Sequence, residues 1–246
     1  MVAAAIAGVV NSIAGGGTLL TFPALLALGV TPAIANATST VALLPGALSS
    51  MLGYRRELDG VQRWTRAITV PSVIGGAIGA WAFLATPPAE FARLVPWLVL
   101  GATALFMANG AVMRRVRRDG ASVERREPES PTLTLLLIQL VVAVYGGYFG
   151  AGVGILMLAS LGFSGFLNIH RMNGLKNWGG FCMNFIASLI FAFTGRVNWP
   201  IALSMAVTAI IGAYAGSRMA QRIGPAPVRR AIVVIGLVSG VWMLAR

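Results

Sequence analysis

Charged residues are scarce in this chain of 246 residues: 11% of positions are Asp, Glu, Lys or Arg, whereas 57% are hydrophobic. A soluble domain carries about 25% charged residues. A chain of this composition has too little polar surface to cover itself in water. The sequence therefore excludes a soluble globular domain and indicates an integral membrane protein that contacts the lipid bilayer.

Cysteine and histidine are nearly absent, with Cys182 and His170 as the single residue of each type. One cysteine excludes an internal disulfide and a cysteine-built metal site, and one histidine excludes motifs that need a histidine pair. We therefore expect no metal and no cofactor. The apolar run from Met1 to Val10 has no basic region before it, which argues against a cleaved signal peptide.

Acidic residues are also few, 7 against 19 Lys and Arg, which gives a net charge of +12. A catalytic site inside the membrane would need a nucleophile with its base or paired acids, so we expect no enzyme. The basic excess fits the cytoplasmic loops of a membrane protein better than a nucleic-acid partner. All the acidic residues fall in loops or at the edges of apolar spans: Glu57, Asp59, Glu90, Asp119, Glu124, Glu127 and Glu129. The interior is therefore neutral to positive, which favours an anion over a cation.

The chain also repeats itself at a spacing of 137 residues. The matched pairs are Gly15 and Gly17 with Gly152 and Gly154, Asn36 with Asn173, Gly75 and Gly79 with Gly212 and Gly216, and Arg93 with Arg230. Many transporters consist of two such repeats with one site between them. The spacing therefore predicts a pseudo-symmetric transporter.

The predicted fold is an all-α polytopic membrane protein with about eight transmembrane helices, built from two four-helix repeats whose first helices are broken by glycine. The first repeat (1–113) and the second (132–246) flank a basic linker (114–131). The expected spans are Val2–Val30, Pro32–Gly53, Thr65–Leu84 and Phe91–Met113, then Leu133–Leu161, Met172–Thr194, Trp199–Ser217 and Pro227–Leu244.

Orientation depends on whether the broken first element crosses the membrane. Four crossings per half make the halves parallel, and this is the arrangement we expect, whereas a re-entrant first element makes the repeat inverted. In the parallel case, 12 of the 19 basic residues lie on one side, including six arginines of the linker. The positive-inside rule then places the linker and both termini in the cytoplasm.

Glycine-rich breaks interrupt the first span of each half. Each glycine costs about 1 kcal/mol in a helix relative to alanine, and open backbone is tolerated at that depth only where it is buried in protein or lines a wet cavity. Freed N–H groups at a half-helix start favour an anion. The alternative is that the glycines serve only close helix packing. The candidate binding residues of the breaks are Asn11, Gly15, Gly16, Gly17 and Thr18, with Tyr148, Gly152 and Gly154.

Polar residues at the start of each second span complete the candidate substrate site: Asn36, Thr38 and Ser39, and Arg171, Asn173, Lys176 and Asn177. Hydroxyl side chains in membrane helices often bond back to their own helix. An ammonium near hydrocarbon costs about 2.5–3.5 kcal/mol unless it snorkels or finds a partner. Lys176 is therefore either a snorkelling residue or the fixed counter-charge of a bound anion.

The run from Asn11 to Thr18, followed by Leu19 to Leu25, resembles the opening signature of the sulfite exporter TauE/SafE family, the toluene sulfonate uptake permeases. Asn36 to Thr40 falls where that family has its segment of small and hydroxyl residues. The resemblance implies transport of small sulfur-containing anions, such as sulfite or sulfonates, with export across the bacterial cytoplasmic (inner) membrane as the expected direction. The alternatives are an uncoupled, channel-like anion facilitator and a non-transporting scaffold or sensor. The sequence leaves the oligomeric state open, with a homodimer among the options.

Overall fold

A computed structural model describes residues 1–13, 16–121, 130–164, 166, 168–219 and 225–244. Over these residues it is helical, with no strand. The first half contains α1 (Val2–Ile13), α2 (Thr18–Ala27), α3 (Pro32–Gly53), the short 3-10 helix η1 (Arg55–Leu58), α4 (Gln62–Ala85) and α5 (Pro88–Ala121). The second half contains α6 (Leu133–Tyr148), α7 (Val153–Phe163), α8 (Ile169–Ala192), α9 (Trp199–Met219) and α10 (Pro225–Leu244). The all-helical prediction is confirmed.

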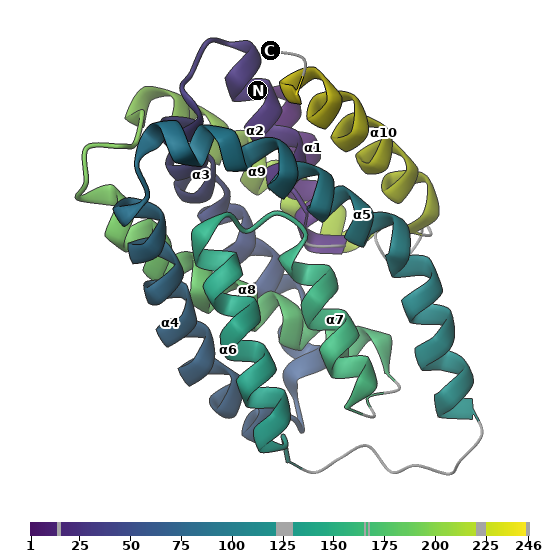
Figure 1. Cartoon of the computed structure of the whole chain (residues 1–246). Coiled ribbons are helices and arrows are strands. Elements are labelled where there is room, and N and C mark those ends of the chain that lie inside the picture. The colour runs from purple at the N-terminus through teal and green to yellow at the C-terminus, as the bar shows by residue number, and fades with distance from the viewer. Residues whose placement is uncertain (14–15, 122–129, 165, 167, 220–224, 245–246) are drawn as a thin grey trace.

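The first predicted span of each half is a pair of short helices that fold back on each other. With 12 and 10 residues, α1 and α2 are about 18 and 15 Å long, roughly half of the 30 Å hydrocarbon core. Figure 1 shows α1–α2 entering from one end of the bundle and α6–α7 from the opposite end, with both tips near mid-height. The structure therefore favours the re-entrant alternative over a broken helix that crosses the membrane.

Both chain ends lie at the same end of the bundle, hereafter the terminal end, and the helices that flank the basic linker meet at the other, hereafter the linker end (Figure 1). Each half therefore ends at the opposite end of the bundle from where it begins: α3 runs from the terminal end to the linker end, and α8 runs the opposite way. The expectation that the linker and both termini share one side of the membrane stays a prediction, and this arrangement of the helices does not favour it. It was based on four crossings per half, and each re-entrant pair removes one crossing.

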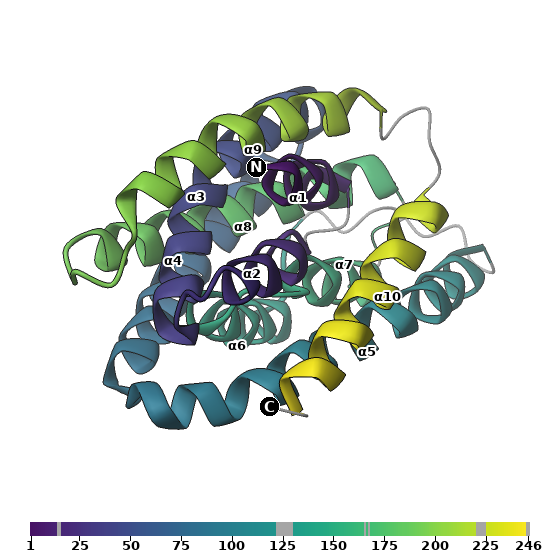
Figure 2. The ribbon, with the colours of Figure 1, turned by 90° about the horizontal axis from the view of Figure 1, so that it is seen from above.

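Three helices of the described chain are both long enough and apolar enough to cross a membrane, Gln62–Ala85, Pro88–Ala108 and Trp199–Gly216. Eight such spans are not confirmed. Of the other long helices, α3 and α8 lie in the middle of the bundle, where they contact each other and α9 or α4 (Figure 2). Because their polar residues are buried by these neighbours, α3 and α8 do not need an apolar sequence throughout.

Glycines allow the re-entrant helices to pack closely against their neighbours. A Cβ atom on Gly79 of α4 would lie 2.0 Å from the backbone oxygen of Val144 in α6, and one on Gly212 of α9 would lie 1.9 Å from that of Ala5 in α1. Gly79 and Gly212, which are matched positions of the repeat, therefore lie at close helix contacts. Large apolar side chains such as Trp81, Trp97 and Ile211 remain exposed on the outside, as expected for a surface that faces lipid.

Candidate functional site

A small cavity lies where the two re-entrant pairs approach the central helices. Its volume is about 40 Å³. Asn11 of α1 reaches it from the first pair, and Val153, Gly154 and Met157 of α7 reach it from the second. The other lining residues come from α3 and α8, and they are Ala47, Ser50, Lys176, Asn177, Gly180, Phe181 and Asn184. Segments far apart in the sequence thus meet at one polar point inside the bundle.

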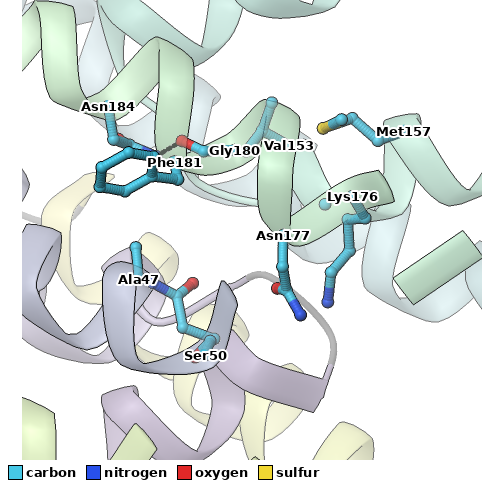
Figure 3. Close-up of a pocket in the computed structure, with 11 residues that line it drawn as sticks. Ala47, Ser50, Val153, Met157, Lys176, Asn177, Gly180, Phe181 and Asn184 are labelled. Atoms are coloured by element: carbon cyan, nitrogen blue, oxygen red, sulfur yellow. Dashed lines mark hydrogen bonds between the residues drawn. The ribbon is translucent and has the colours of Figure 1, made fainter. Parts of the chain in front are cut away.

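Lys176 is the only basic residue among those that line the cavity, and none of them is acidic. Its side chain is 2% exposed, so it does not snorkel to the surface, and that alternative is wrong. Figure 3 shows Lys176 and Asn177 projecting side by side from α8. Removing a cation from water costs several kcal/mol unless other groups compensate. The arrangement therefore places a buried amine, which is a cation when protonated, beside a space that an anion can share.

Two polar groups of the cavity, from Asn177 and Ser50, have no hydrogen-bond partner among the described residues. They are the Nδ2 donor of Asn177, whose side chain is 7% exposed, and the Oγ of Ser50, which is 1% exposed. An unsatisfied buried polar group costs about 1–3 kcal/mol. Such groups are kept where a ligand or water completes their hydrogen bonds. Both groups can donate to an oxyanion.

The first turn of α7 adds a partial positive charge. Gly152 caps this helix in the left-handed region at φ 76°, a conformation that glycine adopts without strain. The next two residues, Val153 and Gly154, line the cavity. The unpaired N–H groups at the start of a helix attract negative charge. The start of α7 therefore directs the positive end of its helix dipole toward the cavity that Lys176 lines.

Four of the predicted binding residues therefore lie in one cavity: Asn11, Gly154, Lys176 and Asn177. The Oδ1 of Asn11 accepts a hydrogen bond from the backbone N–H of Gly17 at 3.2 Å. This bond joins the end of α1 to the start of α2. It uses the Oδ1 of Asn11, so the Nδ2 is the part of this side chain that can donate to a ligand in the cavity.

Four other candidates join the helices near the terminal end. Asn36 donates from Nδ2 to the carbonyl oxygen of Tyr148 at 3.0 Å, which ties α3 to the tip of the second pair. The Oγ1 of Thr38 accepts from the backbone N–H of Asn198, and Ser39 bonds Thr21. The Nδ2 of Asn36 and the hydroxyls of Thr38 and Ser39 are thus bonded within the protein, whereas the buried Oδ1 of Asn36 has no partner among the described residues.

The remaining candidates do not line the cavity. Gly16 packs against the ring of Phe106 in α5, while Gly17 and Gly152 precede the first residues of α2 and α7. Thr18 begins α2, and Arg171 and Asn173 lie in the first turns of α8. Gly15 lies outside the described residues.

Ser50 and Asn184 line the cavity but were not predicted. Asn184 is two helical turns after Asn177 on the same face of α8, with its Nδ2 bonded to the Gly180 carbonyl at 2.8 Å, so the spacing alone could have indicated it. Ser50 comes from a different helix, and no local pattern in the sequence places it beside Lys176.

The sequence profile of the family described as sulfite exporter TauE/SafE matches residues 1–243. The chain belongs to the TauE/SafE family. As a TauE/SafE protein it is an integral membrane transporter and not an enzyme. Relatives share this length and are named as transporters. A probable membrane transporter protein of Haemophilus influenzae is 28% identical over 240 residues, which cover 97% of this chain and 91% of the relative.

Two further relatives have similar coverage. The probable membrane transporter protein ORF9 of a Sinorhizobium species is 28% identical, over 99% of this chain and 90% of its own. The probable membrane transporter protein YfcA of Escherichia coli K12 is 29% identical, over 98% and 87%. No solved structure matches the chain.

Proposed function

We propose that the protein moves a small sulfur-containing anion, such as sulfite or a sulfonate, across the bacterial inner membrane, and that the anion binds in the cavity beside Lys176. The observation that carries this proposal is the buried ammonium of Lys176 next to two buried polar groups that have no partner, Asn177 Nδ2 and Ser50 Oγ. The sulfur chemistry is an inference from the family, and the anionic charge is an inference from the cavity.

The size and lining of the cavity support a small oxyanion. A buried water needs about 10–15 Å³ of such space, so a volume of 40 Å³ has room for about three waters, or for one anion of a few heavy atoms. Hydrogen bonds to charged groups contribute about 1.5–3 kcal/mol each. Lys176, Asn177, Ser50 and the start of α7 approach from three different helices, which suits an anion with several oxygens.

The distribution of basic residues supports a cytoplasmic linker end. Among the described residues, nine arginines belong to elements at the linker end, against Arg93 and Arg196 at the terminal end: Arg55, Arg56, Arg63, Arg66, Arg114, Arg115, Arg117, Arg118 and Arg171. By the positive-inside rule the linker end faces the cytoplasm, and both termini face away from it.

This orientation supports export. Ser50 lies one turn before the end of α3, and Lys176 lies seven residues after the start of α8. These positions place the cavity about 10 Å from the linker end and therefore nearer to the cytoplasm. An inside-negative potential favours the exit of an anion by about 2.3 kcal/mol per charge per 100 mV.

We also propose that residues 1–113 and 132–246 form an inverted repeat around this cavity. Each half has two short helices followed by three longer ones, and the corresponding helices run in opposite directions. Ala47 and Asn184, which are 137 residues apart, both line the cavity. In inverted-repeat transporters the substrate site lies at such an interface, close to broken helices.

An uncoupled facilitator is the alternative mechanism that the cavity supports, since none of the residues lining it is a carboxylate that could carry a proton or bind sodium. A scaffold or sensor is the alternative without transport. Reconstituted proteoliposomes separate the three. We expect saturable sulfite flux that Lys176→Met abolishes. A proton flux in fixed proportion indicates coupling, and the absence of any saturable flux contradicts the proposal.

A further inference from the structure

Arg196 is a second cationic group of the membrane domain, at the opposite end of α8 from Lys176. It lies in the connection between α8 and α9 at the terminal end. Its Nη2 donates to the Leu84 carbonyl oxygen at 3.4 Å, and its guanidinium carbon lies 5.8 Å from the ring centroid of Phe83. These two contacts fix the plane of the guanidinium and leave its other amino group, Nη1, to be satisfied elsewhere.

The Nη1 of Arg196 is buried and has no hydrogen-bond partner among the described residues. A guanidinium has its donors in a rigid fork that fits the oxygens of an oxyanion, so one arm without an acceptor is a missing half of such a contact. A buried charged donor without a partner is costly. A structural role would need only the contacts to Leu84 and Phe83, and it would leave this donor unexplained.

Aromatic rings stand beside Arg196. Phe83 contacts Phe91, Tyr148 and Phe191 with ring centroids 4.8, 6.2 and 5.1 Å apart. Phe191 is on α8 between Lys176 and Arg196, and Tyr148 is the last residue of α6. From Lys176 to the end of α8 at Ala192 the helix rises about 24 Å. Phe191 lies one residue before the end of α8, so the ring cluster lies at the Arg196 end of this helix, away from Lys176.

Two hydroxyl groups accompany the guanidinium. The Tyr148 hydroxyl lies 3.3 Å from the Oγ1 of Thr86, two residues after Leu84, whose carbonyl holds Arg196. Tyr148 also packs on the same Phe83 ring that faces Arg196. Arg196 and the hydroxyls of Tyr148 and Thr86 are thus linked through Phe83 and the end of α4.

We propose that Arg196 is a second anion-binding residue, which receives the oxyanion at the terminal end after it has passed the aromatic rings. The proposal rests on the proposed function, because it assumes that an anion leaves the Lys176 cavity toward this end. It assigns a different role to each cation. Lys176 sets the affinity for an anion that enters from the linker end, and Arg196 sets the affinity for an anion that enters from the terminal end.

Sulfite flux in right-side-out and inside-out membrane vesicles tests the proposal, since the two preparations present the anion to opposite ends. We expect Arg196→Gln to raise the KM at the terminal end about tenfold or more, the loss that one charge-assisted hydrogen bond predicts. The KM at the linker end should change less than twofold. Arg196→Lys, which keeps the charge but loses the fork, should give an intermediate KM. Arg93 is exposed on α5 at the same end, so Arg93→Gln is the matched control and should change neither KM.

Equal changes at both ends, or none, would overturn the role of Arg196. If Arg196→Gln does not fold, a KM of Arg196→Lys equal to that of the wild type at the terminal end overturns it as well. Failure of the proposed function gives a different result: the wild type itself then shows no saturable sulfite flux and no stabilisation by sulfite. A wild type that binds sulfite through Lys176, with both Arg196 variants unaltered, overturns only the second site.

Discussion

Replacing Asn177 by aspartate tests the sign of the charge that the cavity accepts. The substitution keeps the size of the side chain and places a carboxylate beside the Lys176 ammonium, where the Asn177 amide now has an unpaired Nδ2. A bound anion would then face a like charge at hydrogen-bond range. Two like charges about 4 Å apart repel by roughly 4 kcal/mol at an effective dielectric constant of about 20, which corresponds to roughly a thousandfold weaker binding.

Asn177→Leu is the matched control, since it removes the hydrogen bond without adding a charge. A hydrogen bond to a charged group contributes about 1.5–3 kcal/mol, so this variant should bind roughly 10- to 160-fold more weakly. Both affinities are measured by titrating purified protein in detergent with sulfite and following thermal unfolding. Asn177→Asp with a Kd within threefold of the wild type would refute an anion beside Asn177, and tighter binding of a cation would reverse the assigned charge.

Three other substitutions test the packing and the site. Gly212→Ala should lower the free energy of unfolding by about 1–3 kcal/mol or more, because its Cβ would lie 1.9 Å from a backbone oxygen of α1. The control Gly101→Ala, with no atom within 4 Å of its Cβ, should be neutral or up to about 1 kcal/mol more stable. Equal melting temperatures for the two variants would contradict the close packing. Gly180→Val should weaken sulfite binding without loss of stability, since it adds atoms to a cavity of 40 Å³ at a position with open space; unchanged affinity in a titration would remove Gly180 from the site. Asn36→Leu should destabilise the protein by about 1–3 kcal/mol, because it leaves the Tyr148 carbonyl without its donor, and an unaltered melting curve in the absence of anion would show that this bond contributes nothing.

Much of the fold can be read from composition and spacing. The scarcity of charge predicts the membrane, and the spacing of 137 residues predicts two equivalent halves. The relative orientation of the two halves cannot be read in this way. A broken span and a re-entrant pair have the same local sequence, about 25 to 30 apolar residues interrupted by glycine. Only the packing of α1 on α9 and of α6 on α4 decides between them, and those contacts join residues far apart in the chain.

The candidate site was predictable in part for a similar reason. Lys176 and Asn177 are conspicuous in apolar sequence, and the cavity contains both. Asn36, Thr38 and Ser39 are equally conspicuous, but their polar atoms bond neighbouring helices. A polar residue in a membrane helix can serve either purpose, and the choice depends on which groups face it across the bundle.

A thermal-shift screen of the purified protein tests the central claim most directly, with sulfite, sulfate, thiosulfate, sulfoacetate, taurine and chloride as ligands and Lys176→Met as the paired variant. A ligand that binds only the folded state at 100 times its Kd stabilises it by about 2.7 kcal/mol. We predict a selective upward shift of the melting temperature with at least one sulfur-containing anion, and its loss in Lys176→Met. No shift with any sulfur-containing anion, or an equal shift in both proteins, would contradict anion binding beside Lys176.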